Sequence, residues 1–231
     1  LGYSNLASAT AATAIGVANI ASGNTSIAMG RQSTASGQTA LALGNVAQAS
    51  AADAIAIGTS VQASQQGAIA IAIGGGTTVA STNQDTTASK ATGTNAIAIG
   101  TSAVASNGDA IAMGTGSSAT GSSSISIGNG TLTNNTGGGS NSGQTAVGQS
   151  AQALAQDATA VGLQSVAKGV NSLAIGNQLT VSGSQAIGIE VTGVGGTISG
   201  SNAVVINPDG ARSEEHTSEL QSHSFISYAV F

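Results

Sequence analysis

Apolar and small residues alternate in short runs along most of the chain, and a glycine closes nearly every run. In Ala54–Gly58 the letters are AIAIG, which places both isoleucines on one side of an extended chain and both alanines on the other. Alanine is the best helix former, but the isoleucines lie two positions apart rather than three or four. We therefore predict a short β-strand at each run.

The glycine that closes each run returns at a nearly constant interval. Gly2, Gly16, Gly30, Gly44 and Gly58 are each 14 residues apart, and the same step reappears later in the chain. A short fixed period is typical of a solenoid, in which each repeat forms one coil. The closing glycines are Gly16, Gly30, Gly44, Gly58, Gly74, Gly100, Gly114, Gly128, Gly148, Gly162, Gly176 and Gly188.

One repeat contains the signals for two strands and two corners. A turn-forming residue precedes the first strand, the closing glycine follows it, and a second strand of the form x-Ala-x-Ala comes next, as at Ala103 and Ala105. Stacked coils pair each strand with its equivalent about 4.8 Å away, which predicts an all-β, parallel β-solenoid. The turn-forming column contains Asp53, Asn95, Asp109, Asp157 and Asn171.

The first strand of each repeat is apolar on both faces. We expect its large residues, such as Ile55 and Ile57, to fill the interior of the coil. The opposite column of small residues then forms a contact between chains, because a solvated face would be more polar. On this hypothesis the protein is an oligomer, and a single chain exposes four alanines that the assembly buries: Ala54, Ala56, Ala98 and Ala112.

Two segments carry a resemblance to a known family. Asn171–Gly176 (NSLAIG) and Asn24–Ser33 (NTSIAMGRQS) resemble the head repeat of trimeric autotransporter adhesins, the YadA-like head. The resemblance extends over residues 1–206. It implies a left-handed β-roll, a homotrimer, and display on the Gram-negative outer membrane for binding to host extracellular matrix such as collagen, or to other cells. The family-matched contact residues are Asn95, Asn171 and Ser172.

Two excursions interrupt the repeat, at residues 75–94 and 129–144, and both are rich in Thr, Ser, Asn and Gly. We expect loops there, either as tolerated insertions or as binding loops. Residues 207–211 suggest a turn or linker. Residues 212–231 match the in-frame translation of a sequencing adapter, so we expect an artefactual, disordered tail. Because the chain opens in mid-repeat, we expect a fragment that lacks its signal peptide, stalk and anchor.

Composition narrows the classes of function. Charged residues make up 6% of the chain and the net charge is −5, so no basic surface is expected for nucleic acid. Hydrophobic residues make up 40%, yet no run is long enough to span a membrane. Cysteine is absent, which excludes disulfides and thiolate metal sites.

The remaining candidate chemistry does not support an enzyme. Both histidines lie within 212–231, so the rest of the chain has no catalytic triad and no zinc site. The Gly-Gly-Gly runs at 74–76 and 137–139 lack the lysine of a phosphate loop. We therefore expect no catalysis, cofactor or metal. The main alternative to an adhesin is an ice-binding or other structural β-solenoid, and a hexapeptide-repeat acyltransferase fits neither the period nor the missing histidine.

Overall fold

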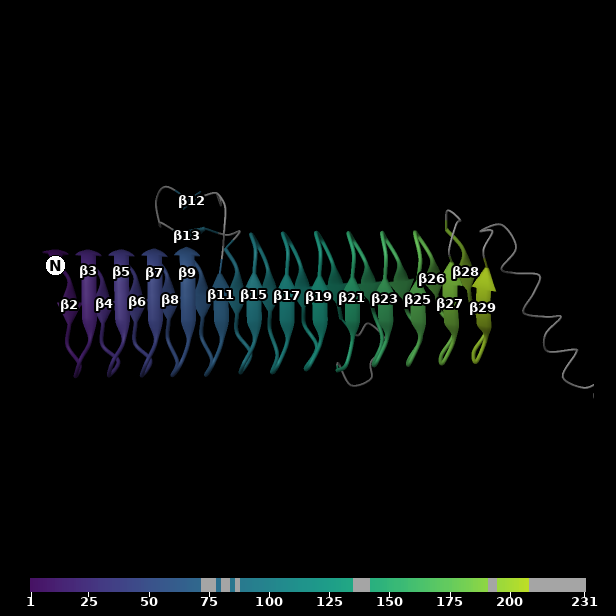
Figure 1. Ribbon diagram of the computed structural model, residues 1–231, viewed down its shortest axis with the longest axis horizontal. Coiled ribbons are helices and arrows are strands. Elements are labelled where there is room, and N and C mark those ends of the chain that lie inside the picture. Colours follow the sequence, from purple (N-terminus) through teal and green to yellow (C-terminus); the bar gives the residue numbers. More distant parts are fainter. Residues whose placement is uncertain (72–77, 80–83, 86–87, 135–141, 191–194, 208–231) are drawn as a thin grey trace, which may run out of the picture. The chain divides into compact units, whose positions relative to one another are not determined.

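A computed structural model describes residues 1–71, 78–79, 84–85, 88–134, 142–190 and 195–207. Every regular element in these ranges is a β-strand (Figure 1). The chain divides into two compact units, residues 1–130 and residues 131–231. Each unit is a parallel β-solenoid, which confirms the predicted fold class.

The first unit contains two parallel sheets whose strands alternate along the chain. Its first sheet consists of β1 (Gly2–Tyr3), β3 (Thr13–Val17), β5 (Ile27–Arg31), β7 (Leu41–Asn45), β9 (Ile55–Thr59), β11 (Ile69–Ile71), β15 (Ile97–Ile99), β17 (Ile111–Met113) and β19 (Ile125–Ile127). Its second sheet consists of β2 (Leu6–Ala7), β4 (Ile20–Ala21), β6 (Thr34–Ala35), β8 (Gln48–Ala49), β10 (Gln62–Ala63), β14 (Lys90–Ala91), β16 (Val104–Ala105) and β18 (Ser118–Ala119).

The second unit has the same construction. Its first sheet consists of β21 (Thr145–Val147), β23 (Thr159–Val161), β25 (Leu173–Ile175), β27 (Ile187–Glu190) and β29 (Val204–Asn207). Its second sheet consists of β20 (Leu132–Thr133), β22 (Gln152–Ala153), β24 (Val166–Ala167), β26 (Thr180–Val181) and β28 (Thr197–Ile198).

The strands pair in parallel with equivalent residues side by side. Ile27 is opposite Leu41, and Leu41 is opposite Ile55, so neighbouring coils are one 14-residue repeat apart. The same step relates Thr159 to Leu173 in the second unit. The spacing of the closing glycines therefore gives the strand register directly over most of the chain.

The corners of the coils use left-handed backbone conformations. The turn-forming column has positive φ, with values of 60° at Asp53, 54° at Asn95 and 57° at Asp109. Asn and Asp tolerate this conformation better than other non-glycine residues, which confirms the predicted turns. Most of the closing glycines also have positive φ, including 131° at Gly58 and 122° at Gly114.

Two closing glycines were aligned wrongly from the sequence. Gly188 lies inside β27 opposite Ala174, so it occupies an inward strand position and Glu190 follows at the corner. Gly74 lies outside the described residues, and Ile71 already pairs with Ile57. The sequence alignment therefore placed the repeat two residues from its true register at both positions.

The two faces of the first strand are opposite to those predicted. Ala54, Ala56, Ala98 and Ala112 are fully buried in a single chain, at 0% exposure, whereas isoleucines such as Ile55 lie half-buried on the outward face. The prediction was wrong because tight corners bring the two sheets close together, and a thin interior accommodates alanine and serine better than isoleucine.

The interior becomes bulkier at the end of the second unit. Leu179, Val181 and Ile198 are buried there instead of alanines. Gly188 provides the space for them, since a Cβ at that position would lie 2.5 Å from Ile198 Cδ1 and 2.8 Å from Val181 Cγ2. The larger buried side chains at the end of this unit are thus accommodated because glycine replaces alanine at the inward position that faces them.

Both excursions include residues with regular places in the coils. In the range 75–94, β12 (Thr78–Val79) pairs antiparallel with β13 (Gln84–Asp85), while β14 belongs to the second sheet of the first unit. In the range 129–144, β20 pairs with β22. The remaining parts of both ranges, and the tail from residue 208, lie outside the described residues.

Candidate functional site

The outward face of the first sheet forms a continuous apolar surface, which we call the apolar wall. From β3 onward each strand contributes two outward side chains ahead of its corner, and none of these is charged in the described strands of either unit. The exposed Arg31 at the end of β5 follows the closing glycine Gly30. In the first unit the exposure of the outward side chains reaches 38–39% at Ile27, Leu43, Met113 and Ile127. In the first unit the fully apolar strands contribute Ile27, Met29, Leu41, Leu43, Ile55, Ile57, Ile69, Ile71, Ile97, Ile99, Ile111, Met113, Ile125 and Ile127.

The second unit has a wall of the same kind with two polar positions. Thr145 and Thr159 occupy the first outward column of β21 and β23, and Leu173 occupies the same column in β25. Contiguous apolar surfaces of this kind mark interaction sites, because soluble proteins rarely leave large ones in water. Both walls therefore leave aliphatic side chains partly exposed in a single chain.

The outward face of the second sheet is mixed in character, and we call it the mixed face. In the first unit it presents one side chain per coil: Leu6, Ile20, Thr34, Gln48, Gln62, Lys90, Val104 and Ser118. Threonine does not dominate this column. The face therefore lacks the uniform ranks of threonine that the ice-binding alternative requires.

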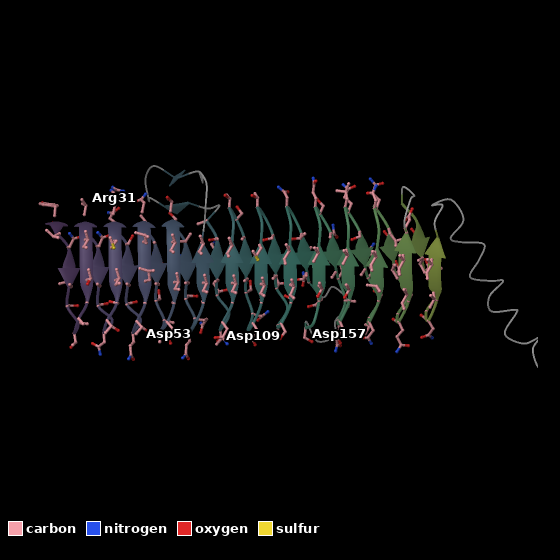
Figure 2. The ribbon with its side chains drawn as sticks, viewed as in Figure 1. Arg31, Asp53, Asp109 and Asp157 are labelled. Carbon is pink, nitrogen blue, oxygen red and sulfur yellow. The ribbon has the colours of Figure 1, made fainter. Side chains whose placement is uncertain are left out.

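The turn-forming column follows one edge of the coils and is exposed. Asn95 Nδ2 donates a hydrogen bond to Asp109 Oδ1 in the next coil at 3.2 Å. Thr39 Oγ1 likewise donates to Asp53 Oδ1. Asp53 and Asp109 extend away from the ribbon at this edge (Figure 2). These side chains are accessible to a ligand, but they also connect neighbouring coils.

The three predicted contact residues differ in accessibility. Asn95 lies in the first unit and Asn171 in the second, and both are exposed turn residues with positive φ. Ser172 is only 1% exposed, and its buried hydroxyl has no hydrogen-bond partner in the described part of the chain. Ser172 points into the coil because it is in the same inward column as Ala158, so it does not suit a contact role.

One structural feature of the interior was not recognised from the sequence. Asn19 Nδ2 donates to Asn5 Oδ1 at 3.0 Å and to Gly30 O at 2.8 Å. Asn19 Oδ1 accepts a hydrogen bond from Ser33 N at 2.9 Å. The signal for this buried ladder was the presence of Asn5 and Asn19 exactly one repeat apart. Its role is structural, since the bonds satisfy backbone groups at the corners.

The described residues contain no grouping of three or more His, Cys, Asp or Glu side chains suited to a metal ion. Across the same residues, no helix has the length and apolar character that would cross a membrane.

Parallel coils, a thin alanine interior and an apolar outward wall define a β-solenoid repeat protein. The model of the YadA head domain repeat (2 copies) matches residues 7–33, 35–60, 87–103, 91–117, 105–131, 145–165, 153–178 and 167–187. These segments cover more than half of the chain, which therefore belongs to this family. It is an adhesin-like surface protein of the trimeric autotransporter kind. No curated protein matches the chain.

Proposed function

We propose that the chain is a head segment of an adhesin displayed on the outer membrane of a Gram-negative bacterium, where it attaches the cell to host extracellular matrix or to other cells. The observation that carries the proposal is the array of YadA head repeats along most of the chain. The exposed polar turn edge and mixed face supply a repeated binding surface. Weak contacts repeated on every coil add up through avidity.

The proposal includes a homotrimer assembled through the apolar wall. Each wall residue recurs at the coil spacing, so an identical copy presents matching side chains coil by coil. Burial of the wall removes from water the aliphatic side chains that a single chain leaves exposed. The mixed face and the turn edge then remain available for a ligand.

Sedimentation of a charged variant tests the assembly. Ile97→Asp places a carboxylate in the wall, and we expect the oligomer to dissociate because clustered, desolvated like charges lack partners. Gln62→Asp is the matched control, since it introduces the same charge on the mixed face of a nearby coil. A stable, soluble wild-type monomer, or equal dissociation of both variants, would contradict assembly through the wall.

A deletion series tests where the ligand binds. If the repeated lateral surface is responsible, binding to a collagen-coated surface should survive removal of the surplus residues of either excursion. It should then decrease gradually as whole 14-residue coils are deleted. Abrupt loss on removing one excursion would place the binding site there and leave the coils as its support.

A further inference from the structure

Two Asn-Gly dipeptides lie at corners of the first unit, Asn107–Gly108 and Asn129–Gly130. In such a dipeptide the glycine nitrogen can attack the side-chain amide carbon of the asparagine. Glycine permits this because it has no side chain to obstruct the approach. The two dipeptides occupy different positions in their turns, so the two glycine nitrogens differ in their hydrogen bonding.

Asn107 is the first residue of a four-residue turn. Ala110 N donates to Asn107 O at 3.3 Å, and Asp109, the third residue, has φ of 57°, which is the pattern of a type II turn. Gly108 is the second residue, and among the described residues its N–H has no hydrogen-bond partner. The Asn107 side chain is exposed. The nucleophile and its target are therefore adjacent, at a half-buried glycine and an exposed asparagine whose Nδ2 also donates to Thr120 O.

Asn129 occupies a different place. Here Gly130 is the third residue of the turn, with φ of 63°, and its N–H donates to Thr115 O of the preceding coil at 2.9 Å. Attack by the Gly130 nitrogen requires the loss of this hydrogen bond between coils. The side chains of Asn129 and Asn107 are both exposed. Asn129 is nevertheless protected from attack by the Gly130 nitrogen, because that nitrogen is held in a hydrogen bond.

We propose that Asn107 is a site of spontaneous deamidation in the folded protein. The Gly108 nitrogen bonds to Asn107 Cγ, its proton is lost to water, and ammonia leaves to form a succinimide. Addition of water then opens the ring at either carbonyl, which produces aspartate or isoaspartate. No oxidant, reductant or enzyme is required.

The product should loosen this corner of the coil. Asn107 Nδ2 donates to Thr120 O in the next coil, and a carboxylate at this position cannot donate that hydrogen bond. The new negative charge also lies two residues from Asp109. Isoaspartate adds a carbon to the backbone where the coils are tightly stacked, since a Cβ on Gly93 would collide with Asn107 O.

Peptide mapping by mass spectrometry tests the proposal. The full chain is incubated at mildly alkaline pH, once folded and once in denaturant, and conversion is followed at both asparagines. We expect Asn107 to convert several-fold faster than Asn129 in the folded protein, relative to their rates in denaturant. Equal relative rates in the two conditions, or an unmodified Asn107, would overturn the proposal.

Gly108→Ala provides the matched variant. A Cβ at this position would meet nothing closer than Thr94 O at 3.9 Å, so the variant should fold normally. We expect it to slow conversion at Asn107 several-fold and to leave Asn129 unchanged. Unaltered conversion at Asn107 would contradict the argument that the missing side chain of Gly108 gives its nitrogen access to the Asn107 amide. Neither experiment depends on adhesion or on oligomerisation.

Discussion

Single residues determine the corners of the coils, and many of them are not the residues that tolerate those corners best. Val46 has φ of 59°, although its branched side chain disfavours a left-handed conformation. Asp53, in the corresponding position of the next corner, has nearly the same φ. The stacking of the coils evidently imposes this conformation whatever residue is present, and the strain can be relieved by substitution.

Replacement of Val46 by asparagine should therefore stabilise the protein. Relief of the left-handed strain is expected to raise the free energy of unfolding by about 1 kcal/mol. Val104→Asn is the control, because Val104 lies in β16 on the mixed face and favours a strand. Chemical denaturation should show opposite signs for the two variants, and a loss of stability in both would contradict the strain argument.

A second residue-scale prediction compares two glycines in adjacent corners. Gly114 has φ of 122°, and a Cβ there would lie 2.5 Å from Gly128 O. Gly114→Ala should therefore lower the free energy of unfolding by roughly 1–3 kcal/mol. A Cβ at Gly108 would meet only Thr94 O, at an ordinary contact distance of 3.9 Å, so Gly108→Ala should have little effect. Similar thermal melting of both variants would show that Gly114 is an ordinary strand residue.

At the scale of elements, the first strand of each coil separates its two faces by side-chain size rather than by polarity. In β15, Ala98 is fully buried between the sheets, while its neighbours Ile97 and Ile99 are half-buried on the apolar wall. The distance between the sheets limits the size of the inward side chains. The outward side chains of a single chain face no second sheet, so their size is not limited in this way. A larger side chain should therefore lower the free energy of unfolding more on the inward face than on the outward face.

Enlarging the inward side chain should destabilise the coil. Ala98→Leu adds volume to a closely packed interior and is expected to lower the free energy of unfolding by about 1–3 kcal/mol. Ile97→Leu conserves volume on the outward face and should cost less. Denaturant titration of both variants checks this, and an equal, small effect would mean that the sheets separate easily.

At the scale of the molecule, the wall gains its extent from repetition of one coil. Each unit presents the same two outward columns on strand after strand, and each coil contacts chiefly its neighbours. Thr145 and Thr159 reduce the apolar area of the wall in the second unit. If copies associate through this wall, these two positions limit the stability of the assembly.

Thr145→Ile together with Thr159→Ile should therefore strengthen the oligomer. Each isoleucine is expected to add roughly 1 kcal/mol per chain through apolar burial. Thr180→Ile is the control, since Thr180 lies on the mixed face. Thermal melts at several protein concentrations should show a higher melting temperature for the double variant alone. An equal increase in the control would mean that the gain does not arise in the wall.

Much of the architecture could be predicted from local patterns. The period of two in Ile55 and Ile57 indicated strands, the 14-residue step indicated the coils, and the Asx column indicated the turns. The register was misplaced at Gly188 because the alignment followed the closing glycine, whereas the strand pairs Gly188 with Ala174. Among the candidate contacts, Asn95 and Asn171 are on the surface, but Ser172 is buried.

The sequence by itself determined strands, corners and repeat, because these depend on residues close together in the chain. It could not determine which face of the first strand lies inside, since alternation of Ile and Ala is compatible with either choice. Only the tertiary structure decided this, through the distance between two sheets whose corners are tight. That distance admits alanine at Ala98 and leaves Ile97 and Ile99 outside. The isoleucine column therefore faces outward, because the interior is too thin to contain it.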